Sequence, residues 1–121
     1  AGRETAGGEG LKVIVARNVS GRSEVERAVR RIAARGAAGE SAAGESGEET
    51  LSAALDTAPW PDPDLVVRTS GEQRLSNFLL WQSSYAELWF PEVLWPDFTE
   101  ADFDRAMEEY ARRDRRFGLV K

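Results

Sequence analysis

The sequence contains no cysteine and no histidine. Without cysteine there is no disulfide framework, no zinc–thiolate site and no thiol nucleophile. Without histidine there is no imidazole acid–base chemistry, and the commonest transition-metal ligand is missing. Any metal must therefore be held by oxygen ligands, which favours magnesium, manganese or calcium.

Long hydrophobic runs are absent as well, so we expect neither a transmembrane segment, which needs roughly 18 consecutive apolar residues, nor a signal peptide. The net charge of −5 argues against nonspecific nucleic-acid binding. The 121 residues, 41% of them hydrophobic, suffice for one compact domain. Because the chain opens on "AGRETAGGEG" without an initiator Met, we expect a part of a longer protein.

The first half of the sequence predicts a strand followed by a helix. "LKVIVA" (residues 11–16) is an apolar, β-branched run typical of a strand buried on both faces of a parallel sheet. A capping box of Ser23 and Glu26, followed by an apolar stripe, predicts a helix that ends near Gly36. The polar residues between them would lie at the strand's carboxyl end, where α/β sheets bind ligands.

Beyond this helix, "AAGES" occurs twice in succession, and residues 37–49 are interpreted as a flexible, low-complexity acidic insertion. "EETLSAALDTA" predicts a short amphipathic helix, and the proline-rich "PWPDPD" an extended entry into a second strand, "DLVVR", that ends at Arg68. The order of these elements, strand, helix, linker, helix and strand, predicts a parallel crossover and an α/β fold.

At the carboxyl end, Thr99 and Asp102 predict the capped start of a helix with a solvated, charged face.

The stretch "RTSGEQRLSNFLLWQSSYAELWF" (residues 68–90) carries the most distinctive polar pattern. We predict that Ser76 caps a helix over the residues that follow, with free amides and the guanidiniums of Arg68 and Arg74 at its entrance. This set of groups suits a diphosphate, and Gly71 would let the backbone approach it closely. A purely structural alternative stays open, in which Arg68 pairs with Glu72 and Ser76 only caps the helix.

Glu87 is a carboxylate in an apolar setting, which is costly unless it is paired with a cation or bound to a metal. It could pair with any arginine, and one carboxylate cannot hold magnesium without water, phosphate oxygens or a second carboxylate. The aromatic residues around it are explained by a core or a dimer interface, or alternatively by an interaction surface.

Together these residues resemble the carboxyl-terminal signature of the cis-prenyltransferases, the undecaprenyl diphosphate synthase family. The likeness rests on R-T-S-G-E-x-R-x-S-N-F, W-Q, Y-A-E-L and L-W-P-D-F, and it extends upstream to "LDTA" and downstream to "RRFG". It is weaker at "ARNVSGR", where the family usually reads A-x-N-Y-G-G-R. Val19 and Ser20 stand at the two positions that differ.

The resemblance implies a mainly parallel central sheet flanked by helices, of which this chain supplies only part, and a homodimer. It implies a magnesium-dependent isoprenyl transferase that condenses isopentenyl diphosphate onto an allylic diphosphate with cis stereochemistry. Glu87 would be a magnesium ligand, and the terminal Arg116 and Gly118 would reach the active site across the dimer. The substrate-binding residues implied are Arg68, Arg74, Leu75, Ser76, Asn77, Arg116 and Gly118.

The family's amino-terminal H-x-x-x-D-G-N-x-R-W-A segment, with its essential aspartate, does not occur in these 121 residues. We therefore assign no catalytic residue and expect the carboxyl-terminal half of such an enzyme, working with an amino-terminal half. The alternative is a noncatalytic partner subunit of a two-chain enzyme, which the retained binding residues disfavour. The resemblance also implies a cytoplasmic protein that associates with the membrane through its product.

Overall fold

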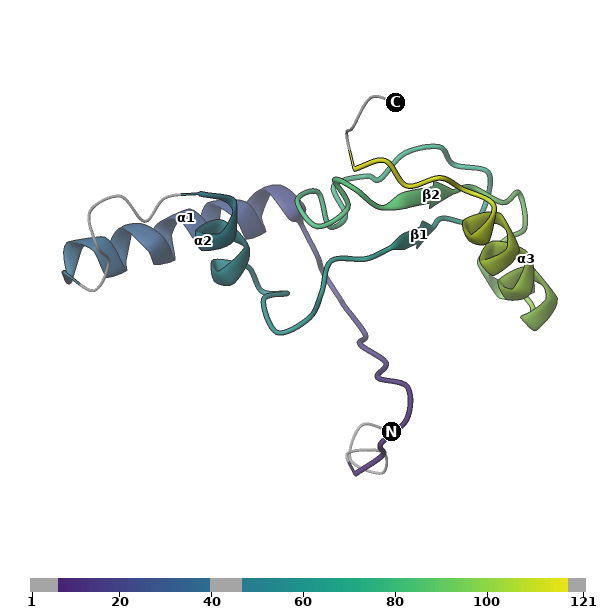
Figure 1. Ribbon diagram of the computed structural model, residues 1–121, viewed down its shortest axis with the longest axis horizontal. Helices are drawn as coiled ribbons and strands as arrows, with labels where there is room; N and C mark the ends of the chain where they lie inside the picture. Colours follow the sequence, from purple (N-terminus) through teal and green to yellow (C-terminus); the bar gives the residue numbers. More distant parts are fainter. Residues whose placement is uncertain (1–6, 40–46, 118–121) are drawn as a thin grey trace.

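The computed structural model describes residues 7–39 and 47–117. Its elements are α1 (Gly21–Ala37), α2 (Glu48–Ala54), β1 (Leu65–Val67), β2 (Glu87–Trp89), the 3-10 turn η1 (Trp95–Asp97) and α3 (Glu100–Ala111). Figure 1 shows α1 and α2 at one end of an elongated molecule, the two strands in the middle and α3 at the other end. Within the described ranges, no helix has the length and apolar character needed to cross a membrane.

The sheet is a parallel pair, β1 beside β2, with Leu65 opposite Glu87 and Val67 opposite Trp89. The predicted α/β class is therefore confirmed. The pair is not the predicted crossover between residues 11–16 and the second strand. Both of its strands come from the second half of the chain. Arg68 directly follows β1, and its amide donates to the Trp89 carbonyl at 3.0 Å.

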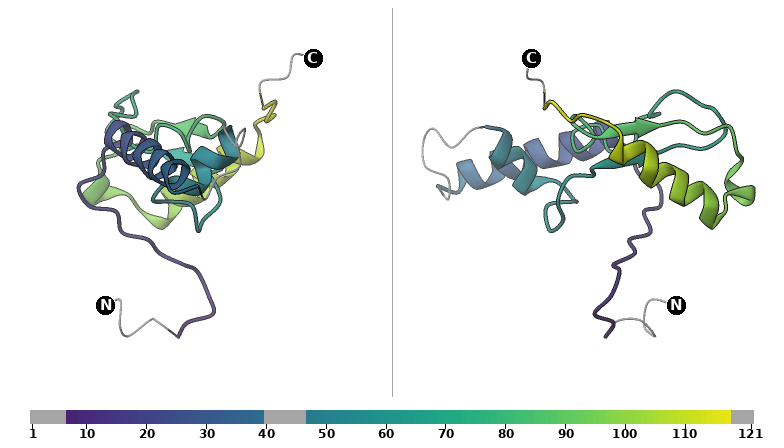
Figure 2. Two further views of the ribbon diagram at one scale, coloured as in Figure 1. Left: turned by 90° about the vertical axis from the view of Figure 1, so that its left-hand side faces the viewer. Right: turned by 45° about the vertical axis from the view of Figure 1, so that its right-hand side comes forward.

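The predicted strand over residues 11–16 does not form. The segment is extended but pairs with neither described strand, and its side chains lie in solvent, with Leu11 93% and Val15 79% exposed. Figures 1 and 2 show it leading away from the body of the molecule. A strand needs a neighbour to satisfy its backbone groups, and the part of the chain that the structure describes offers this segment none.

The predicted helix after it is confirmed as α1, but its capping box is wrong. The helix begins at Gly21 with Ser20 as N-cap, three residues before Ser23. A distant residue explains the early start, because the main-chain oxygen of Asn77 accepts from the Gly21 amide at 2.7 Å and its side-chain oxygen from the Arg22 amide at 2.9 Å. These amides are orphan donors of the first turn. The helix also continues past Gly36 to Ala37.

The short helix α2 is confirmed, and it packs against α1 around a small core of Ala28, Ala54 and Leu55. Trp81 packs against this core, as predicted for a structural aromatic, whereas Trp95 is 70% exposed and stacks on Phe98. Residues 37–49 are interpreted from the sequence as a flexible insertion. Of these, residue 37 belongs to α1, residues 38–39 form a turn, and residues 48–49 belong to α2. Residues 40–46 lie outside the described part.

The predicted helix after Ser76 is wrong. Residues 75–85, which we call the turn segment, form successive turns, and Glu87–Trp89 form β2 instead of the end of a helix. Ser76, Asn77 and Leu79 have φ values of 49°, 64° and 43°. Non-glycine residues in this left-handed region do not continue a right-handed helix. The apolar spacing of the segment therefore does not produce a helix. Trp81 packs against the core between α1 and α2, whereas Phe78, Leu80 and Tyr85 are exposed.

The capped start of α3 is confirmed. The Thr99 hydroxyl accepts from the Asp102 amide at 3.4 Å, and the Asp102 carboxylate accepts from the Thr99 amide at 2.8 Å. Both bonds satisfy backbone donors that the helix itself leaves unpaired. The Thr99 hydroxyl also donates to the Asp102 carboxylate at 2.7 Å. This bond and the one from the Thr99 amide lower the pKa of Asp102, and a weaker lowering comes from Arg105.

Candidate functional site

The loop that follows β1 brings Arg68 and Ser76 into contact. One guanidinium nitrogen of Arg68 donates to the Ser76 hydroxyl at 2.8 Å and to the Arg74 carbonyl at 2.6 Å. Arg74 directs its guanidinium to Glu72 and is 62% exposed. The structural alternative, in which Arg68 pairs with Glu72, is therefore wrong, because Glu72 pairs with Arg74. We call Arg68, Arg74 and Ser76 the arginine–serine cluster.

The backbone of this loop is held by the segment that follows β2. The Ser70 amide donates to the Val93 carbonyl at 2.8 Å, and the Gly71 amide to the Pro91 carbonyl at 2.9 Å. Gly71 has φ +64°, a conformation that glycine adopts without strain. The arginine–serine cluster therefore projects from a loop that two backbone hydrogen bonds fix to the segment after β2, and the predicted helix, whose terminal amides would have faced a ligand, does not form there.

Leu75 lines a cavity of about 230 Å³ together with Val66, Val67, Arg68 and Phe78. The walls are apolar apart from the Arg68 side chain. A site of this kind places one fixed cation at the edge of a hydrophobic hollow, which suits a ligand with an anionic head and a hydrocarbon body.

Asn77, predicted as a binding residue, has its polar atoms directed at α1. Beside the two bonds that cap the helix, its side-chain nitrogen donates to the Ser20 hydroxyl at 2.9 Å. Gly21 lies so close to this turn that an added Cβ would stand 2.8 Å from Leu80 Cγ. The structure thus joins the polar loop at residues 17–22 to the turn segment, although 55 residues separate Arg22 from Asn77.

Glu87 lies at the start of β2, and its side chain is 24% exposed. Its carboxylate accepts from the Arg113 guanidinium at 2.9 Å, which realises the arginine pairing that the sequence left open. Arg115, two residues after Arg113, donates to the Asp64 carboxylate, and this hydrogen bond raises the pKa of Arg115. Two carboxylates and two guanidiniums therefore neutralise each other next to the sheet.

This arrangement does not by itself fit a magnesium ion. Among the described residues, no group of three or more acidic side chains is placed to hold a metal. Glu87 offers one carboxylate, already engaged by a cation, whereas magnesium needs six oxygens in octahedral geometry. Glu87 can therefore supply one carboxylate ligand, and the other magnesium ligands must come from groups outside the described acidic side chains.

Of the carboxyl-terminal pair, Arg116 is 60% exposed and lies 3.7 Å from Asp114, and Gly118 lies outside the described residues. Its neighbour Arg115 is more enclosed, contacts the Tyr110 hydroxyl at 3.2 Å and stacks over the Phe117 ring. The structure therefore places Arg116 on the surface, apart from the contacts that organise the arginine–serine cluster.

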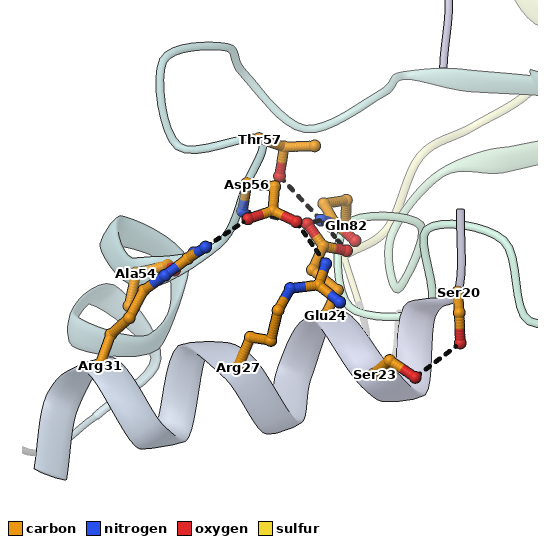
Figure 3. Close-up of polar contacts among 9 residues, drawn as sticks. All are labelled: Ser20, Ser23, Glu24, Arg27, Arg31, Ala54, Asp56, Thr57 and Gln82. Atoms are coloured by element: carbon orange, nitrogen blue, oxygen red, sulfur yellow. Dashed lines mark hydrogen bonds and ion pairs between the residues drawn. The ribbon is translucent and has the colours of Figure 1, made fainter. Parts of the chain in front are cut away.

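A polar network between α1, the loop after α2 and the turn segment was not predicted (Figure 3). It is buried at Glu24 and Gln82, whereas its side chains Asp56, Arg27 and Arg31 are about half exposed. Gln82 donates to Glu24 and Thr57, and the Asp56 carboxylate accepts from Arg27 and Arg31, with Arg31 at 2.8 Å. Hydrogen bonds from Arg27, and secondarily Arg31, lower the pKa of Asp56. The short patterns W-Q and "LDTA" contain Gln82, Asp56 and Thr57, but neither pattern indicates that these residues meet α1.

Comparison with known families gives a single consistent result. A family model described as "Putative undecaprenyl diphosphate synthase" matches residues 1–118. The isoprenyl transferase of Rhizobium meliloti is 53% identical over 114 residues, covering 94% of this chain and 46% of the relative. The isoprenyl transferase of Geobacillus kaustophilus is 51% identical over 118 residues, covering 98% of this chain and 46% of the relative.

Solved structures agree. Lavandulyl diphosphate synthase from Lavandula x intermedia, in complex with dimethylallyl diphosphate, matches with a TM-score of 0.89 and 38% identity over 95% of this chain and 50% of that one. A probable undecaprenyl diphosphate synthase from Campylobacter jejuni matches with a TM-score of 0.80 and 38% identity over 97% of this chain and 52% of that one. The chain thus spans about half the length of the relatives it matches.

Proposed function

Because this chain belongs to the undecaprenyl diphosphate synthase family of prenyltransferases, we propose that it supplies the carboxyl-terminal half of an isoprenyl transferase. The complete enzyme condenses isopentenyl diphosphate onto an allylic isoprenyl diphosphate with cis stereochemistry and releases a polyprenyl diphosphate. In each step the alkene of isopentenyl diphosphate forms a bond to the allylic carbon. Diphosphate leaves that carbon with the bonding electrons, and a proton is lost from the new chain.

The observation that carries this proposal is the joint position of the arginine–serine cluster and the apolar cavity. Arg68 reaches both, since it donates to Ser76 and also lines the cavity with Leu75. A guanidinium and a hydroxyl suit diphosphate oxygens, and the cavity suits the short hydrocarbon of isopentenyl diphosphate. In this role Arg68 and Ser76 hold the diphosphate, while Leu75 and Phe78 exclude water from the alkene.

Magnesium dependence and a homodimer are part of the same proposal. Magnesium neutralises charge on the departing diphosphate when it is bound. Glu87 is the described carboxylate that we assign to magnesium, with the remaining ligands drawn from diphosphate oxygens, water and the amino-terminal half.

The proposed homodimer rests on the carboxyl-terminal pair. Arg116 and Gly118 are assigned to the active site of the second protomer, which is consistent with the exposure of Arg116. Cytoplasmic location, and membrane association through the product, follow from the same assignment.

The test is incorporation of labelled isopentenyl diphosphate into polyprenyl product. One sample is this chain alone. The other is the fusion enzyme, in which the amino-terminal half of the Rhizobium meliloti isoprenyl transferase precedes this chain. We expect product only from the fusion enzyme, because we assign to this chain one of the two diphosphate sites and one of the carboxylates that the reaction needs. Product from the chain alone, or none from a folded fusion enzyme, would contradict the proposal.

A further inference from the structure

The turn segment is held on α1 by a pair of residues that the proposed function does not use. Gln82 and Glu24, only 3% and 4% exposed, are among the most buried polar residues of the described chain. The Gln82 side-chain nitrogen donates to both carboxylate oxygens of Glu24 at 3.1 Å and to the Thr57 hydroxyl at 2.7 Å (Figure 3). Glu24 also accepts from the Asp56 amide at 3.1 Å. We call this contact the Glu24–Gln82 link.

The conformation of the turn segment depends on such attachment. Ser76, Asn77 and Leu79 all have positive φ values, and non-glycine residues keep this conformation only where their surroundings impose it. Asn77 attaches the turn to the first residues of α1, and five residues later Gln82 attaches it to Glu24 in the next part of the same helix. Ser76 directly precedes the first of these two points, so its position depends on how the turn segment is attached to α1.

We propose that Glu24 and Gln82 are positioning residues for the diphosphate-binding cluster, an inference that rests on the proposed function. They touch no substrate atom and act through Ser76. If the link is broken, the turn relaxes, the Ser76 hydroxyl moves, and Arg68 loses one of the two acceptors that orient its guanidinium beside the apolar cavity. A buried, fully engaged carboxylate is a costly way to hold a helix to a loop, which is consistent with a geometric requirement.

The first test uses single substitutions in the fusion enzyme. Gln82→Met keeps the side-chain size and removes the donor, and Glu24→Gln keeps the shape and removes the charge. We expect each to raise the KM for isopentenyl diphosphate about five- to tenfold, with the KM for the allylic diphosphate changed by less than about twofold. Glu26→Gln is the matched control, because Glu26 lies on the same helix but is 61% exposed and bonded to Arg30. It should change neither constant.

The second test exchanges the pair. In Glu24→Gln combined with Gln82→Glu, the amide at position 24 donates to the carboxylate at position 82, and the Thr57 hydroxyl becomes a donor. We expect Gln82→Glu alone to be the most damaging variant, because it buries two carboxylates in contact. The exchange should restore the KM for isopentenyl diphosphate to within about threefold of the unmodified value. If the pair contributes only to stability, the exchange variant should recover its melting temperature without a selective recovery of the KM for isopentenyl diphosphate.

A double-mutant cycle with Ser76→Ala tests whether the link acts through Ser76. We expect the Gln82→Met and Ser76→Ala effects on the KM for isopentenyl diphosphate to be non-additive, since both remove the same contact to Arg68. Equal effects on both substrates, additive effects, or a failed exchange would overturn the positioning role. If Arg68→Ala and Ser76→Ala themselves leave this KM unchanged, the proposed function of the cluster fails instead, and the two failures are distinguishable.

Discussion

Arg68 is held by two acceptors, whereas Arg74 is paired with Glu72 and mostly exposed. In the fusion enzyme we expect Arg68→Ala to raise the KM for isopentenyl diphosphate about 10- to 150-fold, corresponding to the roughly 1.5–3 kcal/mol of a charge-assisted hydrogen bond. Arg74→Ala should act in the same direction but less strongly, because Arg74 must first leave Glu72. Steady-state kinetics with each substrate varied in turn measures both effects.

The matched control for these variants is Arg30→Ala, which removes an exposed arginine bonded to Glu26 on α1. It should leave both Michaelis constants unchanged. If Arg68→Ala weakens the allylic substrate as strongly as isopentenyl diphosphate, then Arg68 holds the loop in place for both substrates, and its assignment to one diphosphate is wrong.

Arg113 donates to one oxygen of the Glu87 carboxylate, so a metal bound by Glu87 shares or displaces this contact. We expect Glu87→Ala to lower magnesium-dependent turnover of the fusion enzyme at least tenfold, with an about 1–2 °C change in melting temperature, because a partly exposed ion pair contributes about 1 kcal/mol or less. Magnesium titrations and melting curves measure the two effects. Glu109→Ala, which removes an i,i+3 partner of Arg112, is the control. Full activity with unchanged magnesium dependence would remove Glu87 from the metal site.

Asp56 provides a prediction about pH, because its neighbours Arg27 and Arg31 lower its pKa from the ordinary value of 3.8. A carboxyl group whose pKa is lower in the folded state stabilises the fold fully above its unfolded pKa. That stabilisation is lost as the pH falls through the folded pKa. We therefore expect Asp56→Asn to reduce the urea midpoint of the fusion enzyme at pH 7 and to have a vanishing effect as the pH drops below about 3.8. The exposed Asp104→Asn is the comparison, and a pH-independent difference for Asp56→Asn would contradict the assignment.

At the scale of elements, the contact between the start of α1 and the turn segment decides how the loops around the cluster meet. Gly21 leaves no room for a side chain, since an added Cβ would lie 2.8 Å from Leu80 Cγ and 3.1 Å from the Asn77 carbonyl. We expect Gly21→Ala to destabilise the fusion enzyme by about 1–3 kcal/mol, the usual cost of overpacking. Urea unfolding of the variant measures this cost.

Gly36 in the same helix is the matched control, because an added Cβ there meets nothing within 4 Å. Gly36→Ala should stabilise the protein by about 0.5–1 kcal/mol through the ordinary helix preference for alanine. If both substitutions shift the midpoint in the same direction, the close approach of α1 to the turn segment is not maintained in solution.

At the scale of the whole molecule, the exposed apolar segment at residues 11–16 marks a face that the described chain does not cover. Leu11, Val13 and Val15 are each more than three-quarters exposed, at 93%, 76% and 79%. Contiguous exposed apolar residues of this kind indicate an interaction surface. In the proposed enzyme, we expect these residues to become a strand when the amino-terminal half is present.

Amide hydrogen exchange tests this expectation. The amides of residues 11–16 should exchange within seconds in the chain alone and become protected in the fusion enzyme, because a paired strand uses its amides in hydrogen bonds. The amides of α3 serve as the internal reference, since their helical bonds are present in either case. Equal protection of residues 11–16 in both samples would show that the segment does not need the other half.

The sequence by itself determined the features that depend on neighbouring residues. The helical stretches of α1, α2 and α3 follow from local apolar spacing, and the Thr99–Asp102 capping box is complete within four positions. The strand that ends directly before Arg68 follows from its β-branched run between turn signals. The contiguous R-T-S-G-E-x-R-x-S-N-F motif also sufficed to identify the family, because its residue types and spacing are specific.

Tertiary structure alone decided the features that depend on distant partners. Helical spacing predicted a helix after Ser76, but hydrogen bonds between Asn77 and residues 20–22, and from Gln82 to Glu24, stabilise left-handed residues there. The start of α1 was mispredicted for the same reason, since its first amides are capped by a residue that a local capping box cannot include. Residues 11–16 show the converse case, because a run suited to a buried strand becomes one only when another strand lies beside it.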